Sequence, residues 1–136
     1  MYLVDTNVIS ESRKRKKTNR GIQEFWRDVD PDSVYLPIQA IGEIRRGVEN
    51  IKYRGDLQQA EALERWLISI LIEYGDRILP FDEDCAQAWG ELMSPHPQNL
   101  IDKQIAAIAL IYGLTVVTRN TNNFLSTGVL LTNPFF

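Results

Sequence analysis

At 136 residues the chain is long enough to bury one sizeable core, which predicts a single domain over residues 1–136. Apolar residues make up 44% and charged residues 24% of the chain, as in globular proteins, and its one cysteine, Cys85, excludes an internal disulfide and favours a reducing, cytoplasmic setting. The longest uncharged run, residues 104–118, is shorter than the roughly 20 residues of a membrane span, and the acidic Asp5 argues against a signal peptide, so we expect no membrane partner.

The first third of the chain alternates short apolar runs with amphipathic segments. Residues 2–5 predict a buried strand, and the polar residues that end it can cap a helix beginning near Val8. After a basic stretch, residues 21–29 predict an amphipathic helix. Residues 34–36 predict a second strand, and Pro37 suits the first turn of the helix that follows.

Helices dominate the rest of the chain. The helix after Pro37 carries an apolar stripe at helical spacing, formed by Ile41, Ile44, Val48 and Ile51. The clearest helix spans residues 56–75, with Gly75 as its C-cap and four inward-facing side chains, Leu63, Leu67, Ile70 and Leu71. Further helices are predicted at residues 82–93, capped by Asp82, and at 100–113, with strands at 77–81, 114–118 and 128–132, a loop at 95–99 and a turn at 119–123.

This alternation predicts an α/β protein with a parallel sheet covered by helices on both faces. Sheets of this kind bind their ligands beyond the carboxyl ends of the strands. Asp5 and Thr118 each end a predicted strand, so both lie where such a sheet carries its chemistry.

Several kinds of chemistry are disfavoured by the absence of their motifs. The chain has no glycine-rich phosphate loop and no G-x-S-x-G nucleophile elbow. Its one histidine, His96, lies between two prolines in a predicted loop, which leaves serine or cysteine catalysis without an obvious base. One cysteine and one histidine also exclude a zinc site of the Cys/His type.

Carboxylates are the remaining candidates. Asp5 ends the first strand, Glu43 lies roughly 140° around its helix from the apolar stripe, and Asp102 begins a very apolar helix. Together with Asn123, which follows the strand at 114–118, they can converge at one edge of the sheet. Clustered carboxylates repel one another unless a cation neutralises them, and hard oxygen ligands suit Mg²⁺ or Mn²⁺. The plain alternative is that Asp5 and Asp102 are helix caps and that Glu43 is a surface residue.

Charge is unevenly distributed. The net charge is −3, but six of the fifteen basic residues fall within residues 13–20, leaving 9 basic against 18 acidic residues elsewhere. We call these six residues the basic segment; they are Arg13, Lys14, Arg15, Lys16, Lys17 and Arg20. The segment is either a solvated loop or a patch that binds phosphates, as in RNA recognition.

Five stretches follow one another through nearly the whole chain: YLVDTNVISE, IGEIRRGVENI, LPFDEDCAQAWGEL, IDKQIAAIALIYGLTVVTRNTNNF and TGVLLTNPF. In this order they resemble a PIN domain of the VapC toxin type. The resemblance implies a small three-layer α/β/α fold with a short, mainly parallel sheet. It also implies an Mg²⁺- or Mn²⁺-dependent ribonuclease activity on RNA, a small antitoxin partner and a homodimer.

The resemblance also implies roles for particular residues. The acidic positions of the family map onto Asp5, Glu43 and Asp102, and Thr118 matches the polar residue that ends the fourth strand. One position departs from the pattern, because Asn123 stands where the family usually has an aspartate. An amide oxygen can still ligate a metal or position a water, but it brings no charge, so we expect a second metal to bind weakly or not at all.

Three hypotheses follow for the function. The first is an endoribonuclease toxin, and the second is a catalytically weak PIN-like module that binds RNA or protein, a reading that Asn123 keeps open. The third is an unrelated α/β metal-dependent phosphatase or small-ligand domain. It is weakened because Asn7 stands where a D-x-D motif after the first strand would have its second aspartate. Metal-dependent cleavage of RNA separates the first from the second, and activity on phosphate monoesters favours the third.

Overall fold

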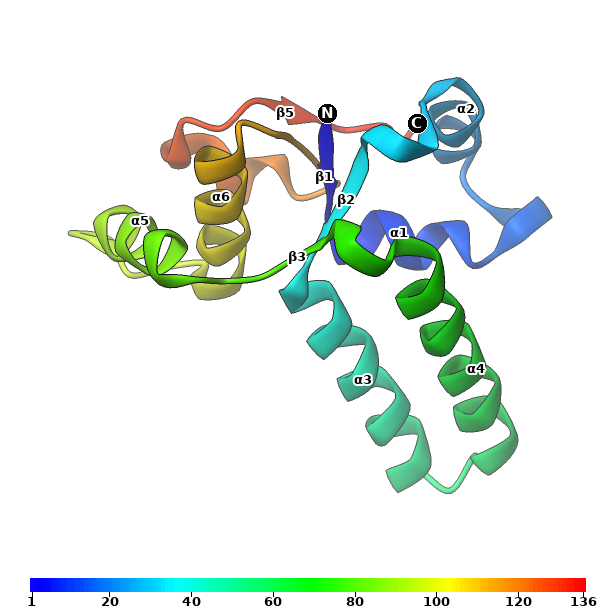
Figure 1. Ribbon diagram of the computed structural model, residues 1–136. Coiled ribbons are helices and arrows are strands. Elements are labelled where there is room, and N and C mark those ends of the chain that lie inside the picture. Colours follow the sequence, from blue (N-terminus) through cyan, green and yellow to red (C-terminus); the bar gives the residue numbers. More distant parts are fainter.

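The sheet has five strands, all parallel, in the order β3-β2-β1-β4-β5 (Figure 1). The computed structural model describes residues 1–136. The strands are short: β1 is Tyr2–Val4, β2 Val34–Pro37, β3 Ile78–Leu79, β4 Thr115–Val117 and β5 Leu131–Thr132. The central strand β1 pairs Tyr2 with Val34 of β2 and with Thr115 of β4. The predicted parallel α/β sheet is confirmed.

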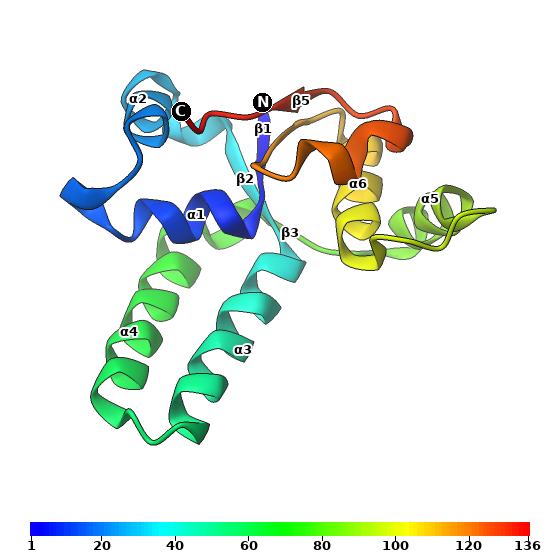
Figure 2. The ribbon, with the colours of Figure 1, turned by 180° about the vertical axis from the view of Figure 1, so that it is seen from behind.

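Helices cover both faces of the sheet. They are α1 (Thr6–Ser12), α2 (Arg20–Asp28), α3 (Ile38–Tyr53), α4 (Leu57–Tyr74), α5 (Glu83–Met93) and α6 (Leu100–Tyr112). Short 3₁₀ turns lie between them, η1 (Arg15–Lys17), η2 (Pro31–Ser33), η3 (Gly75–Arg77) and η4 (Thr121–Thr127). α1 and α2 lie to one side of the sheet and α5 and α6 to the other, while α3 and α4 form a hairpin that extends away from it (Figures 1 and 2).

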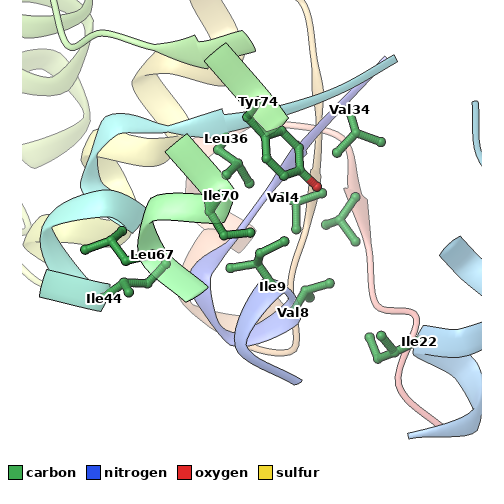
Figure 3. Close-up of a cluster of buried hydrophobic side chains, with 11 residues drawn as sticks. Val4, Val8, Ile9, Ile22, Val34, Leu36, Ile44, Leu67, Ile70 and Tyr74 are labelled. Carbon is green, nitrogen blue, oxygen red and sulfur yellow. The ribbon is translucent and has the colours of Figure 1, made fainter. Parts of the chain in front are cut away.

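The strands β1 and β4 contribute to two cores because successive side chains point to opposite faces of a sheet. Val4 and Val117 face a first core with α1–α4, whereas their neighbours Leu3 and Val116 face a second core with α5 and α6. Figure 3 shows the first core, which consists of Val4, Val8, Ile9, Ile22, Val34, Leu36, Ile44, Leu67, Ile70, Tyr74 and Val117. Full burial of one such aliphatic side chain contributes about 1.5–3 kcal/mol, so the two cores hold the layers together.

The predicted helix ends are mostly confirmed. Asp82 caps α5 by accepting a hydrogen bond from the Cys85 N–H at 3.0 Å. Gly75 and Gly113 follow α4 and α6 with φ angles of 48° and 68°, a region that glycine enters without the steric cost of a Cβ.

Several local predictions were wrong in detail. α1 begins at Thr6 rather than near Val8, and Pro37 belongs to β2 and is the N-cap of α3 rather than part of its first turn. Leu71 is 41% exposed, because the buried face of α4 runs through Leu67, Ile70 and Tyr74. The segment at 77–81 narrows to a strand of two residues, 78–79, and the predicted turn at 119–123 continues into η4.

No helix combines the length and the apolar character that crossing a membrane requires.

The fold brings distant segments to one edge of the sheet. β1 and β4 end there, at Val4 and Val117, and β2 leads there into α3. α6 runs in the opposite direction to the strands, so its first turn lies at the same edge (Figure 1). This edge is therefore where residues after β1, after β4, early in α3 and early in α6 can meet.

Candidate functional site

Asp5 is the buried centre of the site. It follows β1 as the N-cap of α1, and one carboxylate oxygen, Oδ1, accepts the Thr6 N–H at 2.8 Å. The other oxygen, Oδ2, accepts the Thr118 hydroxyl at 2.8 Å and the Asn7 side-chain amide at 3.2 Å. With 4% of its surface exposed, the Asp5 side chain is held in one orientation by donors from two strand ends.

Asn7 joins the end of β1 to the end of β4. Its amide nitrogen donates to the Thr118 hydroxyl oxygen at 3.2 Å as well as to Asp5, and its amide oxygen accepts the Arg119 N–H at 3.1 Å. The sequence suggested only a capping role for Asn7. Its position two residues after Asp5, at the edge where Thr118 was already placed, was the available signal for this contact.

Glu43 reaches the site through Thr6. It lies in the second turn of α3 and is exposed, as its angular distance from the apolar stripe predicted. Its Oε1 accepts the Thr6 hydroxyl at 2.8 Å, while its Oε2 has no hydrogen bond within the protein. Thr6 thus bonds to Asp5 through its backbone and to Glu43 through its side chain, and sequence reasoning missed this second role.

Asp102 and Asn123 form a direct pair. Asp102 lies in the first turn of α6, where the helix dipole favours a negative charge, and it is partly buried. Its Oδ2 accepts the side-chain amide of Asn123 at 2.9 Å, which leaves its Oδ1 free of hydrogen bonds. The residue that replaces the family aspartate therefore acts as a hydrogen-bond donor to one of the predicted metal ligands.

The electrostatics connect the three acids. Burial raises the pKa of Asp5 from 3.8 to about 6, and the hydrogen bonds from Thr118 and Thr6 oppose this rise. The negative charges of Asp102 and Glu43 raise the pKa of Asp5 further, although by less than burial does. Asp5 is thus a desolvated carboxylate that senses two other carboxylates from different helices.

A divalent cation fits this donor set by its chemistry. Carboxylate oxygens are the ligands that Mg²⁺ and Mn²⁺ prefer, and a cation would relieve the mutual repulsion that raises the pKa of Asp5. As the side chains stand, no three Asp, Glu, His or Cys residues converge closely enough to hold a metal. The unbonded oxygens of Glu43 and Asp102 are the groups that would complete such a site around Asp5.

The basic segment lies beyond the C-terminal end of α1. α1 has seven residues and is roughly 10 Å long, so the segment begins about one short helix away from Asp5. Three of its six side chains have partners, since Lys14 pairs with Glu11 at 2.9 Å, Arg20 pairs with Glu24 at 3.4 Å, and Arg13 lies over the Trp66 ring. The other three, Arg15, Lys16 and Lys17, form no ion pair, and the first two line a cleft of about 690 Å³.

Comparison with known proteins places this geometry in a family. The profile described as PIN domain matches residues 2–130, which is nearly the whole chain. The chain belongs to the PIN-domain family. The predicted site residues Asp5, Glu43, Asp102, Thr118 and Asn123 all fall inside the matched range.

Named relatives resemble this PIN domain over their full length. It is 37% identical to toxin FitB of Neisseria gonorrhoeae over 99% of both chains. It is 30% identical to VapC ribonuclease Y4jK of Sinorhizobium fredii, over 99% of this chain and 98% of the relative. The crystal structure of FitAcB from Neisseria gonorrhoeae contains a chain that matches with a TM-score of 0.86 at 34% identity, over 98% of both chains.

Proposed function

We propose that this PIN domain is an Mg²⁺- or Mn²⁺-dependent endoribonuclease and the toxin of a toxin–antitoxin pair. The observation that carries the proposal is the coupling of buried Asp5 to Glu43 and Asp102 at the carboxyl edge of the sheet. A raised pKa beside two further carboxylates is typical of a site that binds a cation or exchanges protons. The names of the relatives, toxin FitB and VapC ribonuclease Y4jK, support the toxin and the ribonuclease roles.

The chain's own residues prepare the site for this chemistry. A bound Mg²⁺ or Mn²⁺ would activate a water molecule and stabilise the negative charge that develops on the attacked phosphate. Thr118 and Asn7 hold Asp5 in place, Thr6 holds Glu43, and these hydrogen bonds fix the directions of the ligand oxygens. The Asn123 amide does the same for Asp102 and adds no negative charge, which favours one metal over two.

The basic segment would attract RNA to the surface near the acidic site. The unpaired cations Arg15, Lys16 and Lys17 are available to phosphates because no acidic side chain neutralises them. Binding of this kind weakens with salt as counterions are released. The basic segment would therefore retain the RNA backbone, while the acidic site would act on a single phosphodiester bond.

Protein partners would cover exposed apolar surface. We include a small antitoxin and a second copy of the chain in the proposal, in a cytoplasmic setting. The support is the relative named toxin FitB, together with large hydrophobic side chains left exposed on α4 and α6. These are Leu57, Ile68, Leu71, Ile72, Leu100, Ile101, Leu110, Ile111 and Tyr112.

The test is cleavage of a labelled single-stranded RNA by the purified protein with Mg²⁺, with Mn²⁺ and with EDTA. We expect cleavage only with a divalent metal, and we expect Asp5→Asn to abolish both cleavage and growth arrest on expression while the protein stays folded. Asp76→Asn, an exposed carboxylate on η3, is the matched control and should cut normally. Growth arrest by a folded Asp5→Asn variant would refute the assignment of Asp5.

A second candidate is a PIN-like module that binds RNA or protein without cutting it. The observation that favours it is the amide of Asn123, which leaves the site with one carboxylate fewer than the family pattern. RNA binding by the wild-type protein without cleavage at any metal concentration would select this reading. Hydrolysis of a generic phosphate monoester would instead favour the phosphatase hypothesis.

A further inference from the structure

Arg119 is fixed to the site through its backbone. It directly follows Thr118, whose hydroxyl bonds to Asp5. Its N–H donates to the Asn7 side chain at 3.1 Å, and Asn7 in turn bonds to Asp5 and Thr118. The start of the Arg119 side chain is therefore positioned by the same hydrogen bonds that orient the buried carboxylate.

The charge of the Arg119 side chain is not neutralised by an ion pair. It is exposed, it forms no ion pair, and its guanidinium makes no hydrogen bond within the protein. The pKa of Glu11 is lowered mainly by its hydrogen bonds from Lys14 and from the Asn19 N–H, each at 2.9 Å, and the positive charge of Arg119 adds a smaller contribution. The fork of N–H donors on Arg119 is thus open to an anionic ligand.

An aromatic ring holds the guanidinium in place. The Arg119 guanidinium carbon lies 4.1 Å from the centre of the Phe135 ring, within the range of a cation–π contact. Phe135 packs against the first core, and its N–H bonds to the Asn133 side chain at 3.0 Å. A side chain immobilised in this way loses little conformational freedom when it binds a ligand.

The C-terminal segment that carries Phe135 is bonded to the start of α2. The side chain of Asn19 accepts the N–H of Phe136 and donates to its carbonyl oxygen, both at 3.2 Å. The backbone of the same segment passes so close to Gly21 that a Cβ there would lie 1.8 Å from the Pro134 oxygen. Phe135 is therefore anchored between the first core and the start of α2, beside the basic segment.

Arg119 lies between the acidic site and the basic segment. On one side its backbone contacts Asn7 in the first turn of α1. On the other its guanidinium lies over Phe135, whose neighbour Phe136 bonds to Asn19 within residues 13–20. RNA bound at the basic segment must also lie close to the carboxylates of the acidic site, which repel its phosphates. An arginine here can bind a phosphate with two hydrogen bonds, a geometry that a lysine does not offer.

We propose that Arg119 is a substrate-positioning residue that binds a backbone phosphate of single-stranded RNA beside the acidic site, with Phe135 as its fixed platform. The inference rests on the proposed ribonuclease function and assigns one contact within it. Arg119 would set where the strand lies relative to Asp5, whereas the basic segment would supply general attraction.

The experiment measures the affinity of a fluorescently labelled oligouridine in EDTA, which prevents cleavage, over a series of KCl concentrations. We expect Arg119→Gln to weaken binding roughly tenfold and to lower the log–log salt slope by about 0.7, the value for one phosphate contact on a single strand. Phe135→Leu and Arg119→Lys keep the charge, so they should keep the slope. Both should weaken binding about two- to fivefold, because Phe135→Leu removes the ring and Arg119→Lys removes the geometry for two hydrogen bonds. The control is Arg54→Gln, an exposed arginine without an ion pair beyond the end of α3, which should change neither quantity.

The results distinguish an error in the Arg119 assignment from an error in the proposed ribonuclease function. A wild-type protein that neither binds nor cuts RNA would refute the proposed function itself. If the wild type binds and cuts RNA but Arg119→Gln matches Arg54→Gln in slope and affinity, only the assignment of Arg119 is wrong. Should Arg119→Gln fail to fold, the two charge-retaining variants decide, because wild-type affinity in both Phe135→Leu and Arg119→Lys would overturn the proposal.

Discussion

Asp5→Asn should change how stability depends on pH in the metal-free protein. The native state raises the pKa of Asp5 from 3.8 to about 6, mainly by burial, so it holds this proton more tightly than the unfolded chain does. Between about pH 4 and pH 6 the native state therefore binds more protons, and the wild-type protein loses stability as pH rises through this window. A shift of about two pH units at about 1.4 kcal/mol each gives a loss of about 3 kcal/mol by pH 7.

The asparagine variant cannot undergo this titration. Relative to Asp5→Asn, the wild type should lose about 3 kcal/mol of unfolding free energy between pH 4 and pH 7, which corresponds to a relative fall in Tm of roughly 10 °C for a domain of this size. Urea denaturation followed by circular dichroism at a series of pH values, in EDTA, measures the difference. Comparing differences between the two proteins removes the pH effects of all other groups that they share.

Asp76→Asn serves again as the control, since this exposed carboxylate should leave the wild-type profile unchanged. Parallel profiles for wild type and Asp5→Asn between pH 4 and pH 7 would show that Asp5 does not ionise in a desolvated site, and the electrostatic argument for the site would be wrong. Added Mg²⁺ or Mn²⁺ should raise the Tm of the wild type at pH 7 and that of Asp5→Asn much less, because a cation binds the ionised carboxylate.

Three further changes test other parts of the molecule. The first replaces Lys14, Arg15, Lys16 and Lys17 of the basic segment by glutamine. The log–log salt slope of RNA binding should fall by up to about 0.7 per lost phosphate contact, while the cleavage rate at saturating RNA should change little. An unchanged slope would identify the segment as a solvated loop. Asn123→Asp should exchange the 2.9 Å hydrogen bond to Asp102 for repulsion, so it should lower the Tm without metal and tighten Mg²⁺ or Mn²⁺ binding, and overlaying metal titrations would contradict this. Gly21→Ala should lower the Tm clearly, because its Cβ would overlap the neighbouring backbone oxygen 1.8 Å away, and an unchanged Tm would show that this contact can relax.

The fold was predictable because its signals are local. Each signal determines the structure of only a few neighbouring residues. Examples are the apolar runs at residues 2–4 and 115–117 and the helix caps Asp82 and Gly113. Parallel strands connected by helices then follow from the alternation of these elements. The exposure of Leu71 was not predicted, because helical spacing shows which side chains share an apolar face but not whether another element packs over the edge of that face.

The positions of the carboxylates, of Thr118 and of Asn123 at this edge were predictable, but the contacts among them were largely not. Asp5, Glu43 and Asp102 could be placed at one edge by topology and by family resemblance, and metal binding by them stays a prediction. The hydrogen bonds that orient them were not predictable, because Thr6 reaches Glu43 across 37 positions and Asn123 reaches Asp102 across 21. Such contacts depend on how helices pack against the sheet, which no spacing within one segment encodes.

The position of β4 has a consequence for synthesis on the ribosome. β4 lies between β1 and β5, and Thr118, which follows it, supplies a hydrogen bond to Asp5 from a residue 113 positions later in the chain. A nascent chain that has exposed only Asp5 and Glu43 has neither Asp102 nor the strand that completes the edge, so it cannot form the site. The proposed activity would then begin only after almost the whole domain has been translated.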